Sequence, residues 1–236
     1  MNIALILAGG KGSRMGNTDQ PKQFIDIYGK PLIIHTLECF DRHREIDYII
    51  VACLKEWQED LKIWIRKYDI NKVKWIVDGG EARQESVYNG LKLIEKEIES
   101  EDIIVIHDSA RPLVSHRIIS ENIDVAKRYG AADTVIPATD TIIKSEDTKV
   151  IHSVPKRNEL YLGQTPQSFR FSIIKEAHEY SKQKDIKEAT DDCQLVLKTG
   201  HPVHMVNGDS LNFKITKAED LLLLKSVIKI GKLEMV

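Results

Sequence analysis

The stretch LAGGKGSRMG, residues 7–16, places glycines and two cations directly after the first apolar run of the chain. Glycines at this density let the backbone turn sharply and approach a ligand closely. Successive backbone N–H groups in such a turn can point at one anion, and Lys11 and Arg14 add positive charge. Another cation, Lys22, follows in PKQF. The pattern predicts a loop that binds phosphate.

This loop matches neither of the two common phosphate-binding motifs. The dinucleotide fingerprint needs G-x-G-x-x-G, but Gly10, Gly12 and Gly16 leave one residue too many in the second gap. A P-loop ends in Gly-Lys followed by Ser or Thr, and GSRMG does not. An ordinary glycine-rich turn between a strand and a helix stays open as the alternative at this point.

Two more motifs follow apolar, strand-like runs. In DGGEARQES, residues 78–86, a glycine pair lets the backbone approach a base or a ribose, and Arg83 and Ser86 can supply hydrogen bonds. The alternative is a plain turn with a helix cap. In HDSARP, Asp108 precedes Arg111 by three residues. A carboxylate beside a polyphosphate is a natural Mg²⁺ ligand, but it could equally bind a sugar hydroxyl or form a local ion pair.

Two features of the second half add to this set. Lys214 lies within NFKIT, which resembles an apolar strand, and a lysine there is costly unless it meets an anion or reaches solvent. The segment EATDD looks like a helix start with Thr190 as its cap. The sequence shows no Ser-His-Asp or Cys-His nucleophile set, so catalysis would depend on positioning and charge stabilisation. A substrate that brings its own phosphate nucleophile fits this, which points to nucleotidyl transfer. The cations expected around the site are Arg14, Lys22, Arg157 and Lys214.

The elements that must position these residues alternate between strands and helices. Apolar runs predict buried parallel strands, and patterns of period 3.6 predict helices between them. We predict an α/β fold with a Rossmann-like, mostly parallel sheet and helices on both faces. In such sheets ligands bind outside the carboxyl ends of the strands, where all three motifs fall. The expected strands are 3–7, 47–54, 74–77 and 102–108, and the expected helices are about 31–43, 55–67, 82–97 and 116–128.

The second half predicts a protruding β-arm at about 134–158 on a single domain that spans 1–236. Apolar pairs flank the polar turn KSEDTK, which fits a hairpin. An isolated hairpin is marginally stable in water, so we expect a partner surface in a homodimer; an arm folded back on its own domain is the alternative. The remaining segments are read as a loop in GQTPQSF, helices near 171–183 and 190–199, a strand near 202–206 and a helix from about 217 to 228.

Composition limits the function classes. Net charge is −2 over 236 residues, with 42% apolar and 30% charged residues, which argues against a general nucleic-acid binder. Apolar runs are too short for a membrane span, and no signal-peptide pattern is seen, so we expect a cytoplasmic protein without a membrane partner. Three distant cysteines predict neither disulfides nor a zinc site.

Taken in order, LAGGKGSRMG…PKQF, DGGEARQESV, HDSARP, GQTPQSF and NFKIT…EDL resemble the cytidylyltransferases that act on 2-C-methyl-D-erythritol 4-phosphate or on ribitol 5-phosphate. The resemblance covers essentially the whole chain. It implies in-line attack of a polyol phosphate on the α-phosphorus of CTP, with Mg²⁺ bridging phosphate oxygens. The products would be a CDP-polyol and pyrophosphate. The small-molecule partners would be CTP and the polyol phosphate.

The resemblance also implies residue roles. The phosphates and base of CTP would be bound by Ala8, Gly9, Gly10, Gly12, Gly80, Glu81, Arg83 and Ser86. Transition-state stabilisation and positioning of the polyol phosphate would fall to Arg14, Lys22, Arg157 and Lys214. Substrate contacts would come from Asp108, Arg111, Thr141, Thr165 and Thr190, with Asp108 also as the metal ligand. In a dimer linked by the arm, Thr141 and Arg157 would complete the neighbouring site.

The sequence markers for the polyol are mixed. LAGG and YLGQTPQSF look like the ribitol type, whereas Ala110 in HDSARP leans toward the methylerythritol type. We favour ribitol 5-phosphate, which implies cell-wall or capsule polymers; methylerythritol phosphate would imply isoprenoid synthesis. A dinucleotide-dependent oxidoreductase would need an acidic residue at the end of the second strand, where Cys53 and Leu54 stand. A non-catalytic nucleotide-binding regulator and a sugar-1-phosphate nucleotidyltransferase also stay open as functions.

Overall fold

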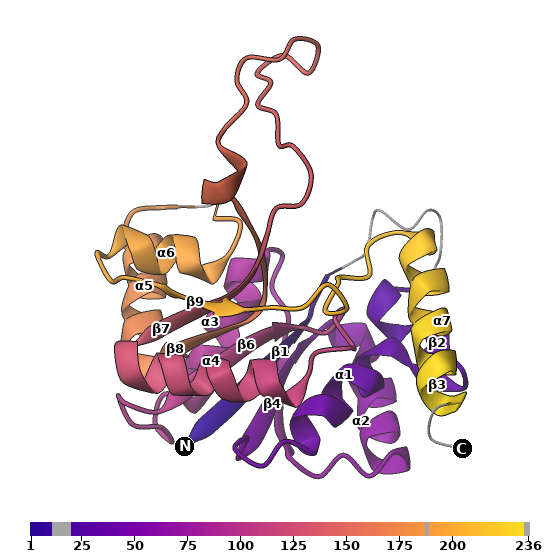
Figure 1. Ribbon diagram of the computed structural model, residues 1–236. Helices are drawn as coiled ribbons and strands as arrows, with labels where there is room; N and C mark the ends of the chain where they lie inside the picture. The colour runs from indigo at the N-terminus through magenta and orange to yellow at the C-terminus, as the bar shows by residue number, and fades with distance from the viewer. Residues whose placement is uncertain (11–19, 187–188, 234–236) are drawn as a thin grey trace.

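A seven-stranded sheet forms the centre of the computed structural model, which describes residues 1–10, 20–186 and 189–233. The strand order is β5-β4-β1-β6-β8-β7-β9 (Figure 1). The strands are β1 (Asn2–Ala8), β4 (Tyr48–Cys53), β5 (Val73–Asp78), β6 (Ile103–Asp108), β7 (Ala131–Pro137), β8 (Tyr161–Arg170) and β9 (His204–Asn207). A two-stranded sheet pairs β2 (Asp26–Ile27) with β3 (Lys30–Pro31).

Helices cover both faces of the sheet, as predicted for the Rossmann-like class. Successive side chains of β1 point to opposite faces, so Ala4 and Ile6 pack into one core cluster and Ile3 and Leu5 into the other. The first cluster contains side chains of α1 (Leu32–Asp41), α2 (Gln58–Lys67) and α4 (His116–Tyr129). The second contains side chains of α3 (Arg83–Ile94), α5 (Phe171–Gln183) and α6 (Asp192–Lys198). The last helix, α7 (Ala218–Leu233), packs on a third cluster.

Parallel pairing aligns the ends of four strands at one edge. β1 lies between β4 and β6, parallel to both, and β5 extends this half of the sheet. The register pairs Ala8 with Cys53, Cys53 with Asp78, and Leu7 with Asp108. The segments that follow these strands therefore leave the sheet side by side, which is the arrangement that the three motifs require.

Two segments of the second half differ from the secondary structure predicted for them. The segment GQTPQSF, expected as a loop, lies within β8, which pairs antiparallel with β6 and β7. Most of its polar side chains are buried, and Gln164, Thr165 and Gln167 make hydrogen bonds, such as the one from Gln167 to Asp133. The strand therefore has no apolar signature. The segment around Lys214, expected as a strand, has no regular structure; Ile215 N–H donates to the carbonyl of Ala110 at 2.8 Å.

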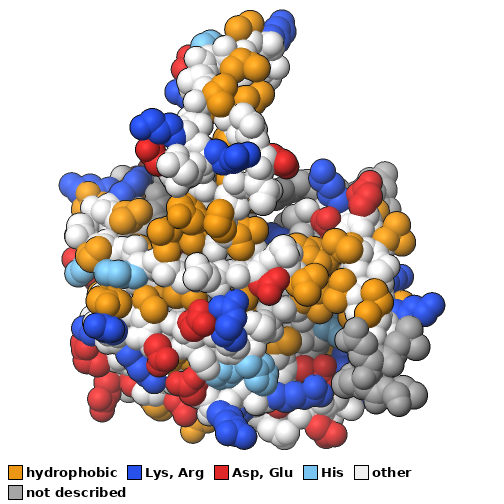
Figure 2. Space-filling model, viewed as in Figure 1, with side chains coloured by type: hydrophobic (Ala, Val, Ile, Leu, Met, Phe, Trp, Pro, Cys, Tyr) orange, Lys and Arg blue, Asp and Glu red, His pale blue; other side chains and the backbone are white. Residues whose placement is uncertain are grey.

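The predicted arm projects away from the sheet between β7 and β8 (Figure 1). One isolated bridge, between Lys144 and Ser153, joins its two sides among the described residues, in place of the predicted ladder. Hydrophobic side chains gather on the arm in Figure 2. Val150, Ile151 and Val154 are each more than half exposed. The arm therefore presents apolar surface that its own chain does not cover.

No helix of the described chain is both long enough and apolar enough to cross a membrane.

Replacing Asp133 on β7 by asparagine is expected to stabilise the protein at neutral pH. Burial raises the pKa of Asp133 to about 6, against the hydrogen bond from Gln167. Between pH 3.8 and about 6 the folded state holds a proton that the unfolded state has lost, so wild-type stability falls over this range and stays at the lower level above it. The Asp133→Asn variant should gain up to about 3 kcal/mol in free energy of unfolding at pH 7.5 and little at pH 4. Urea denaturation at both pH values measures this, and an equal gain at both would contradict the titration.

Candidate active site

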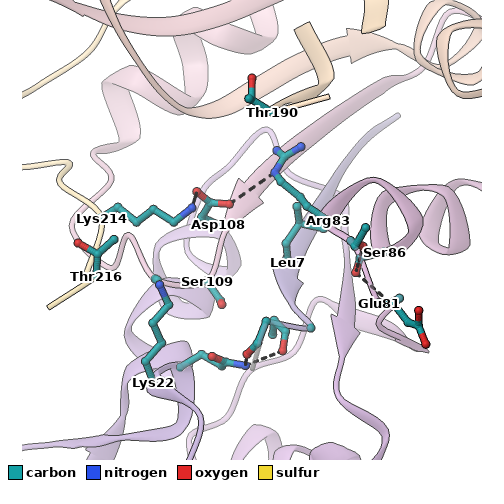
Figure 3. A pocket seen from close by; sticks show the side chains of 17 residues that line it. Leu7, Lys22, Glu81, Arg83, Ser86, Asp108, Ser109, Thr190, Lys214 and Thr216 are labelled. Atoms are coloured by element: carbon teal, nitrogen blue, oxygen red, sulfur yellow. Dashed lines mark hydrogen bonds and ion pairs between the residues drawn. The ribbon is translucent and has the colours of Figure 1, made fainter. Parts of the chain in front are cut away.

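A cavity of about 370 Å³ lies at the aligned ends of β1 and β6 and beside the loop after β5 (Figure 3). Backbone and side chains from six separate segments line it, so the predicted convergence of strand-exit loops occurs. Its lining includes, from the predicted set, Ala8, Gly9, Gly10, Lys22, Gly80, Glu81, Arg83, Ser86, Asp108, Thr190 and Lys214. Gly12 and Arg14, with Lys11, lie outside the described residues.

Glycine allows the two glycine-rich loops to touch each other. A Cβ on Gly79 would stand 2.8 Å from Cα of Gly9, and one on Gly9 would stand 3.1 Å from Cα of Gly79. The Gly79 N–H donates to the carbonyl of Cys53 at 2.8 Å, and the Gly80 N–H donates to Oγ of Ser86 at 2.9 Å. The sequence predicted that the glycine pair lets the backbone approach a ligand. In the structure, Gly79 instead allows close contact with the backbone of Gly9.

Adding one methyl group at Gly79 is expected to separate these loops. The nearest obstacle to a Cβ on Gly79 is the backbone of Gly9, which cannot rotate out of the way as a flexible side chain could. We expect Gly79→Ala to raise KM for CTP about 10-fold or more, because the donors that face the cavity shift. Steady-state kinetics with thermal unfolding as a fold control measure this. An unchanged KM for CTP in a folded variant would contradict it.

Gln23 is a functional candidate that sequence reasoning missed. Its side chain is 2% exposed, and Nε2 donates to the carbonyls of Ala8 at 2.8 Å and Gly10 at 2.9 Å. Gln23 therefore fixes the backbone at the start of the first glycine loop through these two hydrogen bonds. Gln23 lies next to Lys22 in PKQF, which was the signal in the sequence. Only the cation of that motif was considered from the sequence. Ser109 and Thr216 also line the cavity without having been predicted.

Asp108 is the electrostatic centre of the cavity. Nζ of Lys214 lies 2.9 Å from Oδ2, Nε of Arg111 lies 3.5 Å from Oδ2, and Nε of Arg83 lies 3.9 Å from Oδ1. Burial would raise the pKa of Asp108, but Lys214, Arg83 and Arg111 outweigh it and hold the pKa well below its usual range. The local ion pair with Arg111 exists, and Asp108 also orients the cavity-lining Lys214.

Lys22 and Lys214 face the same cavity from opposite ends of the chain (Figure 3). Nζ of Lys22 donates to the carbonyl of Ile215 at 2.9 Å, so the segment that carries Lys214 also positions Lys22. This contact joins the residue after Pro21 to a residue 193 positions later. Two of the cations proposed for one triphosphate therefore share one space.

Arg83 makes a longer-range contact than the sequence indicated. Its guanidinium pairs with the buried Asp192 at the start of α6, and His178 Nε2 lies 2.9 Å from the other oxygen of that carboxylate. Thr190 does not cap α6 as expected; Asp191 does, because its side chain accepts a hydrogen bond from the Gln194 N–H at 2.8 Å.

Four predicted residues lie away from the cavity lining. Thr165 and Arg111 are buried directly behind Asp108, with exposures of 5% and 9%. Thr141 and Arg157 lie on the exposed arm, where Nη1 of Arg157 donates to the carbonyl of Thr139 at 3.3 Å. The structure therefore separates the arm residues from the cavity of their own chain.

Carboxylates that could hold a metal are few in the cavity. The described residues contain no group of three or more His, Cys, Asp and Glu side chains arranged to bind an ion. Asp108 and Glu81 line the cavity. A site of this kind suits Mg²⁺ only if substrate phosphates and water provide most of the ligands, which is usual for Mg²⁺ with nucleotides.

Comparison with known proteins gives consistent matches over nearly the full chain. The family model of 2-C-methyl-D-erythritol 4-phosphate cytidylyltransferase (IspD) matches residues 2–229. A ribitol-5-phosphate cytidylyltransferase of Vibrio parahaemolyticus is 41% identical over 228 residues, covering 97% of this chain and 96% of that protein.

Solved structures show the same architecture. The 4-diphosphocytidyl-2C-methyl-D-erythritol synthase of Anaerococcus prevotii superposes with a TM-score of 0.81 at 28% identity, over 97% of this chain and 96% of that one. The 2-C-methyl-D-erythritol 4-phosphate cytidylyltransferase of Thermus thermophilus superposes with a TM-score of 0.76 at 32% identity, over 96% of this chain and 98% of that one.

Proposed function

We infer the reaction from the family: the chain belongs to the 2-C-methyl-D-erythritol 4-phosphate cytidylyltransferase (IspD) family. The protein is a nucleotidyltransferase that uses CTP as co-substrate, which confirms the resemblance read from its motifs. Its polyol substrate is ribitol 5-phosphate. The observation that carries this choice is 41% identity to a ribitol-5-phosphate cytidylyltransferase over 97% of the chain, against 28% and 32% to the two methylerythritol-type structures.

The cavity suggests how the transfer is assisted. A phosphate oxygen of ribitol 5-phosphate attacks the α-phosphorus of CTP in line, a P–O bond forms, and the bond to pyrophosphate breaks. Backbone N–H groups of the glycine loops would hold the phosphates, and Lys22 and Lys214 would stabilise the charge that develops on them. Asp108 would keep Lys214 aimed at the reacting centre, since their charged atoms are 2.9 Å apart.

Mg²⁺ is part of this proposal. When bound, the ion would offset the negative charge of the triphosphate. Asp108 is the residue proposed to hold it, because its carboxylate is at the cavity and its lowered pKa keeps it ionised. A cytoplasmic location and a role in cell-wall or capsule polymer synthesis complete the proposed context, in keeping with CTP and a polyol phosphate as substrates.

A pyrophosphate-release assay tests the substrate. The assay offers CTP with ribitol 5-phosphate, methylerythritol 4-phosphate or a glycerol phosphate, and in parallel replaces CTP by ATP, GTP or UTP. We expect the highest kcat/KM with CTP and ribitol 5-phosphate. A higher kcat/KM for methylerythritol phosphate would favour a role in isoprenoid synthesis. Tight binding of CTP with no pyrophosphate release for any of these polyol phosphates would favour a non-catalytic nucleotide-binding regulator.

We also propose that 1–236 forms one nucleotidyltransferase domain whose arm, about 134–158, binds a second copy of the chain. Burial of the exposed apolar side chains of the arm against a second chain would remove them from water. Thr141 and Arg157 do not line the cavity of their own chain. In a homodimer they would reach the partner's cavity.

Complementation between two inactive variants tests this sharing of sites. Co-expression of Arg157→Ala and Lys214→Ala chains with different tags gives a mixed dimer with one intact site, if Arg157 acts across the interface. We expect each homodimer to be inactive and the purified mixed dimer to regain about half of the wild-type activity per dimer. A mixed dimer as inactive as its parents would show that Arg157 acts within its own chain.

A further inference from the structure

A closed circuit of hydrogen bonds lies directly behind Asp108. His107 Nε2 is 3.1 Å from the carbonyl oxygen of Arg111, and Nη1 of Arg111 donates to the carbonyl of Asn212 at 2.8 Å. Nδ2 of Asn212 donates to the carbonyl of Thr165 at 2.8 Å, and Oγ1 of Thr165 is 3.0 Å from His107 Nδ1. We call these four residues the polar ring.

The polar ring joins three distant parts of the chain. His107 is the next-to-last residue of β6, Thr165 belongs to β8, and Asn212 lies in the irregular segment two residues before Lys214. His107 and Asn212 are fully buried. Hydrogen bonds between buried polar groups rigidify a core, and the four bonds of the ring run without a break, although Oδ1 of Asn212 and Nε of Arg111 make no hydrogen bond within the described residues. The ring therefore ties the strand that carries Asp108 to the segment that carries Lys214.

The contacts determine which nitrogen of His107 carries the proton. The carbonyl of Arg111 can only accept, so Nε2 must be the donor. Oγ1 of Thr165 accepts from the Asp108 N–H at 3.1 Å, which leaves its hydroxyl proton to donate to Nδ1. An imidazole with its proton on Nε2 satisfies both nitrogens of His107 and the hydroxyl of Thr165. A proton on Nδ1 would leave the threonine hydroxyl without an acceptor in the ring.

We propose that the polar ring is the positioning device of the transfer reaction, in which His107, donating through Nε2, and Thr165 set the place of Asp108. This inference rests on the proposed function. Neither side chain lines the cavity, so both act through Asp108, whose backbone N–H the Thr165 hydroxyl holds, and through the segment of Lys214. Thr165 is then a positioning residue, and its predicted contact with substrate is replaced by contacts within the protein.

Substitution of Thr165 separates positioning from substrate contact. Thr165→Val keeps the shape and removes the hydroxyl, whereas Thr165→Ser keeps the hydroxyl. For Thr165→Val we expect kcat to fall about 10- to 100-fold with both KM values within about threefold, because the reacting groups are misplaced. Thr165→Ser should recover most of the rate. A raised KM for the polyol phosphate with unchanged kcat would overturn the proposal, and so would full activity of Thr165→Val.

Thr134→Val is the matched control. Thr134 is fully buried on β7, and its hydroxyl donates to the carbonyl of Pro166 at 2.6 Å and accepts from Asn122. Thr134→Val loses a buried hydroxyl as Thr165→Val does, but the Thr134 hydroxyl bonds neither His107 nor Asp108. We expect a similar loss of thermal stability with kcat close to that of the wild type. An equal loss of kcat in both variants would show that loss of any buried hydroxyl lowers the rate through stability, and would overturn the proposal.

Nitrogen NMR of the ligand-free protein tests the ring independently of any substrate. The imidazole ¹⁵N signals of His107, assigned by their loss in His107→Gln, should show a neutral ring with Nε2 protonated and Nδ1 as acceptor. The Nδ1 signal should move in Thr165→Val and stay in Thr134→Val. A proton on Nδ1 would overturn the proposal even if Thr165→Val does not fold.

The two levels of inference fail in different ways. Failure of the proposed function would appear as absent turnover of ribitol 5-phosphate by the wild type. Failure of the polar ring would appear as wild-type turnover that Thr165→Val leaves unchanged.

Discussion

Lys22→Ala is expected to lower kcat by about 100- to 1,000-fold while the protein stays folded. The ammonium group of Lys22 lines the cavity and is held by the carbonyl of Ile215 at 2.9 Å. In the proposed reaction, removal deletes a positive charge from the cavity where negative charge would develop on the α-phosphate. Loss of the hydrogen bond to Ile215 costs only about 1 kcal/mol in folding. Single-turnover rates at saturating CTP and ribitol 5-phosphate measure the effect.

Lys62→Ala is the matched control for this prediction. Lys62 is an exposed lysine on α2 that pairs with Glu59 at the surface and does not line the cavity. It loses the same charge and the same side chain, so its rate should equal that of the wild type. An unchanged single-turnover rate in Lys22→Ala would remove Lys22 from the mechanism.

The second large effect is expected for Lys214→Ala. Lys214 Nζ lies 2.9 Å from Oδ2 of Asp108, and among the nearby cations it lowers the pKa of that carboxyl most. Alanine removes a positive charge from the cavity and leaves Asp108 with Arg83 and Arg111 as charge partners. We expect kcat/KM for ribitol 5-phosphate to fall about 100- to 1,000-fold.

Lys217→Ala controls for the loss of a lysine from the same segment. Lys217 is exposed three residues further on and outside the cavity lining. Its kcat/KM should match the wild type, and both variants should keep the wild-type circular dichroism spectrum. A loss of less than about threefold in Lys214→Ala would mean that the ion pair with Asp108 is structural only.

Local sequence patterns were sufficient for most of the elements. The helix predicted near 171–183 matches α5, and those predicted at about 82–97 and 116–128 match α3 and α4 within a few residues. These helices carry apolar side chains at helical spacing, and this signal is contained in the segment itself. β8 was missed because its side chains are polar, and it is a strand only because β6 and β7 supply partners on both edges.

Much of the candidate site was also predictable, for a topological reason. Parallel strands leave a sheet at the same edge, so motifs after β1, β5 and β6 had to meet there. Lys22, Asp108 and Lys214 were singled out by residue type and by resemblance, and the structure places all three at one cavity.

The sequence by itself therefore determined the class of the sheet, the edge at which the chemistry lies and the family of the protein. Only the tertiary structure decided that Gly79 touches Gly9, that Arg83 pairs with Asp192, and that His107 and Thr165 face each other behind Asp108. The physical reason is range. Periodicity and turn chemistry act over a few residues, whereas these contacts join residues 58 to 109 positions apart, or rest on backbone distances that strand register sets.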